Sequence, residues 1–217
     1  MSCAARMIRA TLALVVALAP VTPVLAETNA NVRENAYARI MRSINPRLQQ
    51  GQSRAYAAAL LTNSRRMHLD PRLVMAVVTV ESHWDESAVS VDGAIGLGQF
   101  KPQTAHNLGI DARIGKSNLK GITLYLHRLI GLFASSRHAM SAAIASYNAG
   151  PLAVEAAGGA APGYAAQHYV AKVFATWRSF KAKLGSQPAR APSNALASLA
   201  PDAATIDRAQ AAYWGAR

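Results

Sequence analysis

Apolar residues recur every three or four positions along the middle of the 217-residue chain, and no alternating pattern typical of strands competes with them. The pattern predicts a mainly α domain over residues 53–184, with Ser53 able to cap its first helix. Helices are predicted at residues 53–67, 71–81, 102–108, 118–133, 139–148 and 164–184.

The helix predicted at 71–81 is apolar on nearly all sides and ends at Glu81. Asp70 and Pro71 give it a start, because an Asp side chain caps free backbone N–H groups and Pro lacks an N–H that the first turn would leave unpaired. A carboxyl group among apolar side chains loses water, which disfavours its charged form and raises its pKa. Glu81 is therefore a candidate proton donor near neutral pH, whereas a helix-terminal Glu turned to solvent would simply be ionised.

The segment from Asp85 to Gln99 is rich in Ser, Asp and Gly, and we expect it to form a loop. Gly93, Gly96 and Gly98 permit positive φ angles and a close approach of a ligand to the backbone. No Gly-Lys-Ser or Gly-Lys-Thr follows any of them at the five-residue spacing of a phosphate-binding loop, so a nucleotide site is disfavoured.

The first residues have the pattern of a signal peptide. Arg6 and Arg9 precede an apolar stretch at 10–18, and Val24-Leu25-Ala26 offers the small residues of a cleavage site before Glu27. The apolar stretch is too short for a membrane span. We therefore expect residues 1–26 to be removed and the protein to reach the periplasm as a soluble chain.

Charge and cysteine content narrow the range of partners. Loss of Arg6 and Arg9 leaves 21 of the 23 basic residues against 11 acidic ones, a balance of +10, which favours anionic surroundings. The basic residues are scattered without a nucleic-acid docking motif, and export also argues against nucleic acid. Bacterial cell wall carries carboxylates, which would attract a positively charged protein, and an exported protein would reach it. Cys3, the single cysteine, lies in the segment to be removed, so no disulfide is expected.

The two ends of the exported chain differ from its middle. Residues 27–52 are polar with a few apolar positions and form an N-terminal extension that can hold helical pieces. Residues 185–217 are rich in Ala, Pro and Ser, a composition typical of a flexible tail.

Three groups of residues between 53 and 184 occur in the order and at the spacing of motifs in one known family. The first group is Glu81-Ser82, Trp84, Ala88, Ser90, Gly93-Ala94, Gly96-Leu97, Gln99, Pro102 and Thr104-Ala105. The second is Asn118, Gly121 and Tyr125-Leu126, and the third is Ser146-Tyr147-Asn148-Ala149-Gly150-Pro151. Together they resemble the soluble lytic transglycosylase family, whose third motif usually reads Ala-Tyr-Asn-Ala-Gly.

The resemblance implies a lysozyme-like helical domain with a substrate cleft, and cleavage of the bond between N-acetylmuramic acid and N-acetylglucosamine in peptidoglycan. In this family a single Glu, here Glu81, protonates the glycosidic oxygen while the muramyl N-acetyl group supports the developing cation. The same Glu then acts as a base toward the C6 hydroxyl of the sugar, which closes a 1,6-anhydro ring in place of attack by water. This chemistry implies no metal and no cofactor.

A glycosidase that works with two carboxyl groups would need a partner for Glu81. The candidates for this second carboxyl group are Asp85, Glu86, Asp92 and Glu155. Each of them is equally explained as a solvent-exposed charged residue of a loop or helix. Ser82 and Trp84 are expected to buttress the end of the helix rather than to touch substrate.

The resemblance also assigns substrate-binding residues. Ser90 and Gln99 match residues that hydrogen-bond the sugar. Tyr147 and Asn148 match a pair that faces the catalytic Glu, where a phenol hydroxyl orients the carboxyl group. Taken alone, Ser90 is equally a turn cap, Gln99 a loop amide and Tyr147 a core aromatic residue.

The chain departs from the family pattern at two places. Relatives commonly carry methionine where this chain has Gly98 and Lys101, and many carry Glu-Thr where it has Ala165-Ala166. Lys101 is expected to enter the cleft, where its ammonium group would favour ionised Glu81 or would pair with a carboxylate of the wall peptide. Because Ala165-Ala166 replaces the usual Glu-Thr, the resemblance does not say how substrate is contacted near Ala165.

Other site types lack their signatures. The six histidines form no His-Glu-x-x-His pair, which argues against zinc, and no Gly-x-Ser-x-Gly elbow is present. The alternatives to a lytic transglycosylase are a hydrolytic muramidase on the same fold and a catalytically impaired wall-binding or assembly protein. The size of the chain and its tail suggest, as a further expectation, service to a secretion or conjugation apparatus.

Overall fold

The computed structural model describes residues 22–185, while residues 1–21 and 186–217 lie outside this part of the chain. Two isolated bridges are found within it in place of strands, and the mainly α class is confirmed. The helices are α1 (Thr22–Ile44), α2 (Gln50–Arg66), α3 (Pro71–Ser82), α4 (Pro102–Leu108), α5 (Gly115–Leu132), α6 (Ala139–Ala149), α7 (Pro151–Ala156) and α8 (Gly163–Leu184). The predicted tail and most of the predicted signal peptide fall outside the described residues, so both stay predictions.

Six of these helices, α2 to α6 and α8, correspond to the predicted ones, with ends that differ by up to three residues. Helix α7 was not predicted, because Gly150-Pro151 reads as a turn. Pro151 occupies the first turn of α7, where its missing N–H leaves no hydrogen bond unmade, so the same residue that ends α6 also starts the next helix. The segment from Asp85 to Gln99 contains no helix, as expected.

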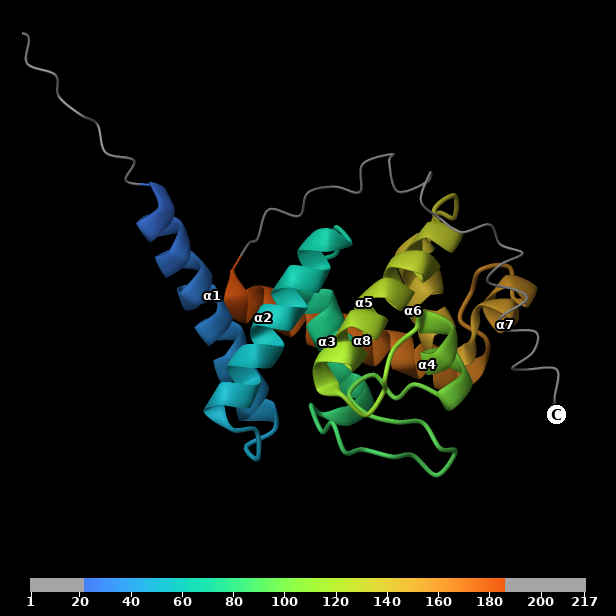
Figure 1. The fold of residues 1–217 in the computed structure, drawn as a ribbon. Coiled ribbons are helices and arrows are strands. Elements are labelled where there is room, and N and C mark those ends of the chain that lie inside the picture. The colour runs from blue at the N-terminus through green and yellow to red at the C-terminus, as the bar shows by residue number, and fades with distance from the viewer. Residues whose placement is uncertain (1–21, 186–217) are drawn as a thin grey trace, which may run out of the picture.

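Helices α1 and α2 lie side by side at one end of the fold, and α7 lies toward the other end (Figure 1). Tyr37, Ala38 and Met41 of α1 are buried in the same apolar core as Leu60 of α2. We had placed the start of the folded core near Ser53, but the core already draws on this part of the N-terminal extension. No helix within residues 22–185 combines the length and the apolar character needed to cross a lipid bilayer.

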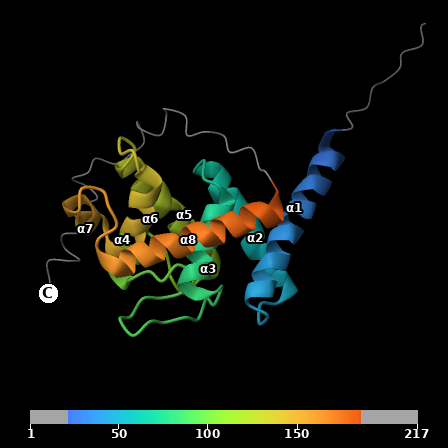
Figure 2. The same cartoon turned by 180° about the vertical axis from the view of Figure 1, so that it is seen from behind.

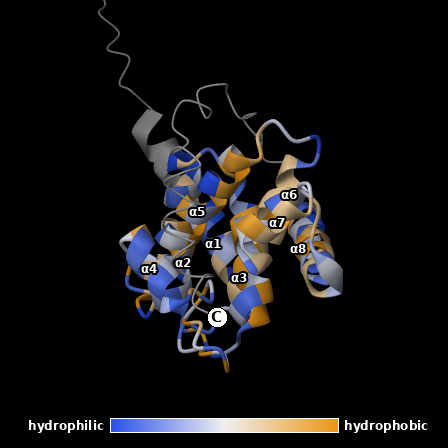
Figure 3. Ribbon diagram, turned by 90° about the vertical axis from the view of Figure 1, so that its right-hand side faces the viewer, coloured by the Kyte–Doolittle hydropathy of each residue, from blue (hydrophilic) through white to orange (hydrophobic). Residues whose placement is uncertain are grey.

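Helix α3 runs through the centre of the fold, and α8 crosses it on the face seen in Figure 2. Every residue of α3 from Arg72 to Val78 is buried, which explains its apolar character on nearly all sides. Small residues of α6 allow close contact with both α5 and α8. Figure 3 shows α6 and α7 mostly in the colours of apolar residues, beside α8.

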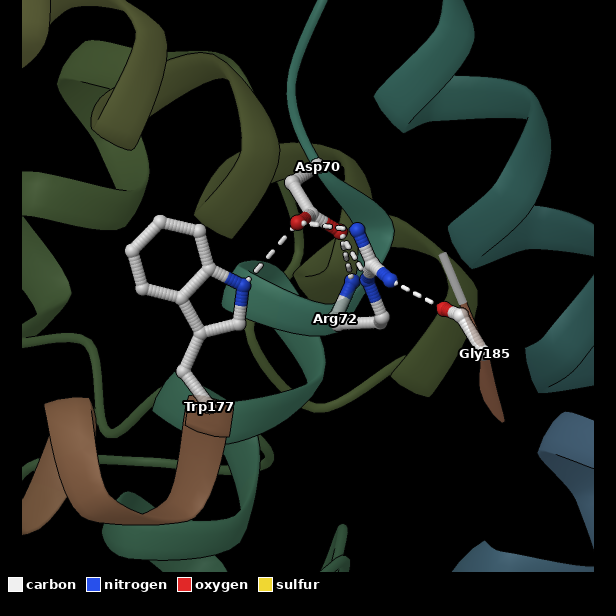
Figure 4. Close-up of polar contacts among 4 residues, drawn as sticks. All are labelled: Asp70, Arg72, Trp177 and Gly185. Carbon is white, nitrogen blue, oxygen red and sulfur yellow. Dashed lines mark hydrogen bonds and ion pairs between the residues drawn. The ribbon is translucent and has the colours of Figure 1, made fainter. Parts of the chain in front are cut away.

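A polar cluster joins the start of α3 to the later turns of α8 (Figure 4). Asp70 accepts the backbone N–H of Arg72 at 2.9 Å, and its carboxylate pairs with the Arg72 guanidinium at 2.8 Å. Trp177 donates its indole N–H to Asp70 at 3.0 Å, and Arg72 donates to the Gly185 carbonyl at 2.5 Å. Burial works to raise the pKa of Asp70, but these hydrogen bonds outweigh it and hold the pKa below its usual range. The cluster fixes α8 antiparallel to α3.

Candidate functional site

Glu81 lies in the last turn of α3, and burial raises the pKa of its carboxyl group to about 7. The helix ends just after it because His83 adopts a left-handed conformation with φ 51° and donates its N–H to the Thr79 carbonyl. Trp84 is also left-handed, with φ 67°, which turns the chain sharply away from the helix. A carboxyl group at this place is shielded by the core on one side and lies beside a loop on the other.

Tyr169 of α8 donates its hydroxyl hydrogen to Oε1 of Glu81 at 2.5 Å. This hydrogen bond favours the ionised carboxylate and lowers its pKa, which partly opposes the effect of burial. Burial in turn raises the pKa of the Tyr169 phenol well above 10, so Tyr169 stays a hydrogen-bond donor at any physiological pH. The pair brings together the end of α3 and the early turns of α8.

Sequence reasoning did not identify Tyr169 as a site residue. A signal was present, because Tyr169 precedes Val170 and Val173 on the apolar face of its helix, and a tyrosine buried on such a face needs a partner for its hydroxyl. Glu81 was expected to be a buried acid and had no assigned partner, so it was a candidate to accept that hydroxyl hydrogen.

Tyr147 was expected to orient Glu81, but the structure gives that hydrogen bond to Tyr169. The Tyr147 hydroxyl donates instead to the carbonyl of Gly98 at 2.9 Å. Its ring packs against those of Tyr125 and Phe100, with centroids 5.4 and 5.9 Å away. Burial raises the pKa of the Tyr147 phenol, and the nearby charge of Glu81 raises it further, so Tyr147 lies near the acid without being bonded to it.

The glycine-rich loop is held in place by Asn118 of α5, which is fully buried. Its Oδ1 accepts the N–H of Gly98 at 2.9 Å, and its Nδ2 donates to the carbonyl of Ala112 at 2.8 Å. A Cβ atom on Gly98 would lie 2.4 Å from Cγ1 of Ile122 and 2.7 Å from the Tyr147 hydroxyl. The departure from methionine at this position therefore has a steric reason: the space is already filled.

Gln99 and Ser90 both hydrogen-bond within the loop. Gln99 has a left-handed backbone with φ 50°, and its Nε2 donates to the carbonyls of Gly96 and Ala88 at 3.0 and 3.2 Å. Ser90 closes a turn by accepting the N–H of Ala94 on its Oγ at 3.0 Å. Both side chains shape the loop that adjoins Glu81, and their contacts with sugar stay predictions.

The substrate contacts expected of Lys101 and Asn148 stay predictions. Lys101 is half-buried and donates its Nζ to the carbonyl of Asp92 at 2.6 Å, across the tip of the loop. The pKa of Glu81 is set by burial and by Tyr169, so the expected influence of the Lys101 ammonium on the acid is not observed. Asn148 lies exposed in the last turn of α6.

Ser82 and Trp84 buttress the end of α3, as expected. Ser82 is buried and donates its hydroxyl to the carbonyl of Leu97 at 2.9 Å, which ties the helix to the loop. Trp84 is fully buried and donates its indole N–H to Oγ1 of Thr79 at 3.1 Å.

The other carboxyl groups considered as partners for Glu81 have their own environments. Glu86 accepts the hydroxyl hydrogen of Tyr56, and Asp85 accepts the hydroxyl and the N–H of Ser87. Asp92 and Glu155 are exposed, on the loop and on α7. Within residues 22–185 no group of three or more His, Cys, Asp or Glu side chains is placed to hold a metal ion.

Comparisons with known proteins place the chain in a family and a fold. The family described as "Transglycosylase SLT domain" matches residues 59–170. A membrane-bound lytic murein transglycosylase F 1 from Alkalilimnicola ehrlichii is 36% identical over 86 residues, which is 38% of this chain and 17% of that protein. A membrane-bound lytic murein transglycosylase F from Yersinia enterocolitica is 36% identical over 63 residues, 29% of this chain and 13% of that protein. The chain thus spans less than a fifth of the length of these relatives.

A solved structure, an inactive mutant of the lytic transglycosylase Slt from Pseudomonas aeruginosa, superposes with a TM-score of 0.50. It is 24% identical, and the match covers 74% of this chain and 30% of that one. Likeness at this identity concerns the fold, and it confirms the expected lysozyme-like helical architecture.

Proposed function

Because the chain belongs to the transglycosylase SLT domain family, we propose that it is a lytic transglycosylase acting on peptidoglycan. The reaction is cleavage of the β-1,4 bond between N-acetylmuramic acid and N-acetylglucosamine with formation of 1,6-anhydro-N-acetylmuramic acid. Glu81 serves as the single general acid and base.

One observation supports this proposal above the others: the Glu81 carboxyl has a pKa of about 7 and is held by Tyr169. A group that must first give a proton and then take one works best when its pKa lies near the operating pH. Burial alone would favour the acid form, and a hydrogen-bond donor alone would favour the base form. The two influences together suit both halves of the reaction.

In the first step the protonated Glu81 acts as an acid. Tyr169 occupies Oε1 as a donor, so the acidic hydrogen belongs on Oε2. That hydrogen passes to the glycosidic oxygen as the bond from this oxygen to C1 of the muramyl sugar breaks. The carboxylate that results is stabilised by the Tyr169 hydroxyl, and the muramyl N-acetyl group supports the positive charge at C1.

In the second step the Glu81 carboxylate acts as a base. It takes the hydrogen of the C6 hydroxyl as that oxygen forms a bond to C1, which closes the anhydro ring. The enzyme returns to its protonated form without consuming water, and no second carboxyl group takes part.

The place of action belongs to the same proposal. The N-terminal pattern of Arg6, Arg9 and the apolar stretch at 10–18 supports export to the periplasm. Service to a secretion or conjugation apparatus, suggested by the size of the chain and by its Ala-, Pro- and Ser-rich tail, is part of the same proposal.

The test is digestion of purified peptidoglycan by the wild-type protein, by Glu81→Gln and by Asp85→Asn as a matched control that removes a loop carboxylate. We expect soluble products with anhydromuramyl ends by mass spectrometry, a loss of about 10²-fold to 10⁴-fold in rate for Glu81→Gln, and little change for Asp85→Asn. Reducing ends would identify a hydrolytic muramidase. Binding without cleavage by any form would identify a wall-binding protein, and equal cleavage with Glu81→Gln would rule out Glu81 as the acid.

A further inference from the structure

Glu86, which follows the acid in the loop after α3, is held by a side chain of α2. Tyr56 donates its hydroxyl hydrogen to Oε2 of Glu86, and Gln52 donates to the same phenol oxygen at 3.0 Å. The ring of Tyr56 stacks on that of Trp84, with centroids 6.4 Å apart. The carbonyl of Trp84 in turn accepts a hydrogen bond from Nδ2 of Asn45, just after α1, at 3.2 Å. The first residues of the loop are therefore fastened to the N-terminal part of the fold.

The start of α5 closes the space around the pair of Tyr56 and Glu86. A Cβ atom on Gly115, the first residue of α5, would overlap both the Tyr56 hydroxyl and the Glu86 carboxylate. No side chain caps this end of α5, and the N-terminal end of a helix favours a nearby negative charge. Glycine at this position leaves room for a contact in which α2, α5 and the loop meet.

The hold on Glu86 is passed on to the other arm of the loop through Ala88, two residues further along. The carbonyl of Ala88 accepts the N–H of Gly96 at 2.8 Å and Nε2 of Gln99 at 3.2 Å. Next to Gln99, the carbonyl of Gly98 accepts the hydroxyl hydrogen of Tyr147, a residue close enough to the acid to feel its charge. Movement of Glu86 would therefore move the part of the loop that lies beside the acid.

We propose that Tyr56 and Glu86 are positioning residues of the reaction: their hydrogen bond fixes the outgoing arm of the loop and so holds the returning arm in place beside Glu81 for the glycan strand to bind. They act through the loop and not on the bond that is cleaved. Tyr56 lies before residues 59–170, which match the transglycosylase family, so the working site draws on a part of the chain outside that match. This inference rests on the proposed function for the identity of its ligand.

Steady-state kinetics on soluble glycan strands test the positioning role with Tyr56→Phe, Glu86→Ala and Glu86→Gln. Tyr164→Phe is the matched control, because it removes the hydroxyl of an exposed tyrosine. We expect Tyr56→Phe and Glu86→Ala each to raise KM about threefold to tenfold with kcat within about twofold of wild type, since each removes a hydrogen bond to a charged group. The two changes together should be no worse than either alone, because both remove the same bond. Glu86→Gln, whose amide oxygen can still accept the hydroxyl hydrogen, and Tyr164→Phe should stay close to wild type.

A merely structural role has a different kinetic signature. Loss of folded protein lowers the apparent kcat in proportion and leaves KM as it was, whereas a poorly held loop weakens binding and raises KM. A lower kcat at unchanged KM for Tyr56→Phe therefore overturns the proposal. Unchanged values of both constants overturn it as well.

Amide hydrogen exchange separates this inference from the proposed function, because it needs no substrate. The Gly96 amide should exchange about threefold to tenfold faster in Tyr56→Phe than in wild type, while amides in the middle of α6 keep their rates. This result supports the positioning role even if the wild-type protein proves not to cleave wall. Equal exchange of Gly96 in the two proteins, or an equal acceleration in α6, overturns the role, and cleavage by the wild type would then leave the lytic function standing.

Discussion

The raised pKa of Glu81 makes a prediction about stability that does not depend on any substrate. An unburied glutamate titrates at 4.5, whereas burial raises the pKa of Glu81 to about 7 in the folded chain. The folded state therefore binds the proton more tightly than the unfolded state does. The stabilisation from this group is fully present below a pH of about 4.5 and is lost as the pH rises through about 7.

The size of the effect follows from the difference between the two pKa values. At about 1.4 kcal/mol for each pKa unit, the upper bound is between about 3 and 4 kcal/mol of unfolding free energy. Glu81 is partly accessible to solvent, which screens the carboxylate, so we expect about 2 kcal/mol between acidic and alkaline conditions. Glu81→Gln removes this dependence, because an amide resembles the protonated acid in shape and does not titrate.

Urea unfolding of wild type and Glu81→Gln at several pH values between 4.5 and 8 measures the effect. The difference in unfolding free energy between them should change by about 2 kcal/mol in favour of Glu81→Gln as the pH rises. All other ionisable groups are the same in both proteins, so their contributions cancel in the difference. Asp85→Asn is the control: hydrogen bonds from Ser87 hold the pKa of Asp85 below its usual range, so this change should add no pH dependence across the range. A difference between wild type and Glu81→Gln that is constant with pH would refute the reasoning.

Three further substitutions test other contacts of the site and its supports. Tyr169→Phe removes the hydrogen-bond donor that stabilises ionised Glu81, so the pKa of Glu81 should rise further. Activity, which falls as Glu81 loses its proton, should then fall at a higher pH in the pH–rate profile. An unchanged profile would contradict this. Gly98→Ala should lower the unfolding free energy by about 1–3 kcal/mol, measured by urea unfolding, because its Cβ has no space. Asp70→Ala leaves the buried Arg72 guanidinium without its carboxylate and should lower the unfolding free energy by about 3 kcal/mol or more; a loss below about 1 kcal/mol would show that the cluster does not hold α3 to α8.

The helices were predictable wherever one face of the chain is continuously apolar. Helix α3 was placed correctly because its start carries a cap and its body is buried all round. Helix α1 gave no such signal: a few residues such as Tyr37 and Met41 make its buried face, and the rest is polar. Helix α1 joins the core by packing against α2, and the local sequence of α1 does not reveal this packing.

The candidate site was predictable as far as Glu81 and its loop, and no further. Whether the hydroxyl of Tyr147 or of Tyr169 reaches the acid is decided by how α8 crosses α3, and Tyr169 lies 88 residues after Glu81. The entry of Lys101 into the cleft stays a prediction, and no pattern in the sequence indicates that its ammonium group donates to the backbone carbonyl of Asp92. Such predictions are limited by the distance along the sequence between the residues that come into contact, rather than by residue type.

Digestion of purified peptidoglycan in water enriched in oxygen-18, followed by mass spectrometry of the soluble products, tests the central claim most directly. If Glu81 returns its proton through the C6 hydroxyl of the sugar, the products are one water lighter than reducing sugars and carry no heavy oxygen. Products with heavy oxygen at their reducing ends would show that water attacks C1, and would contradict the account of Glu81 as the single acid and base of a lytic transglycosylase.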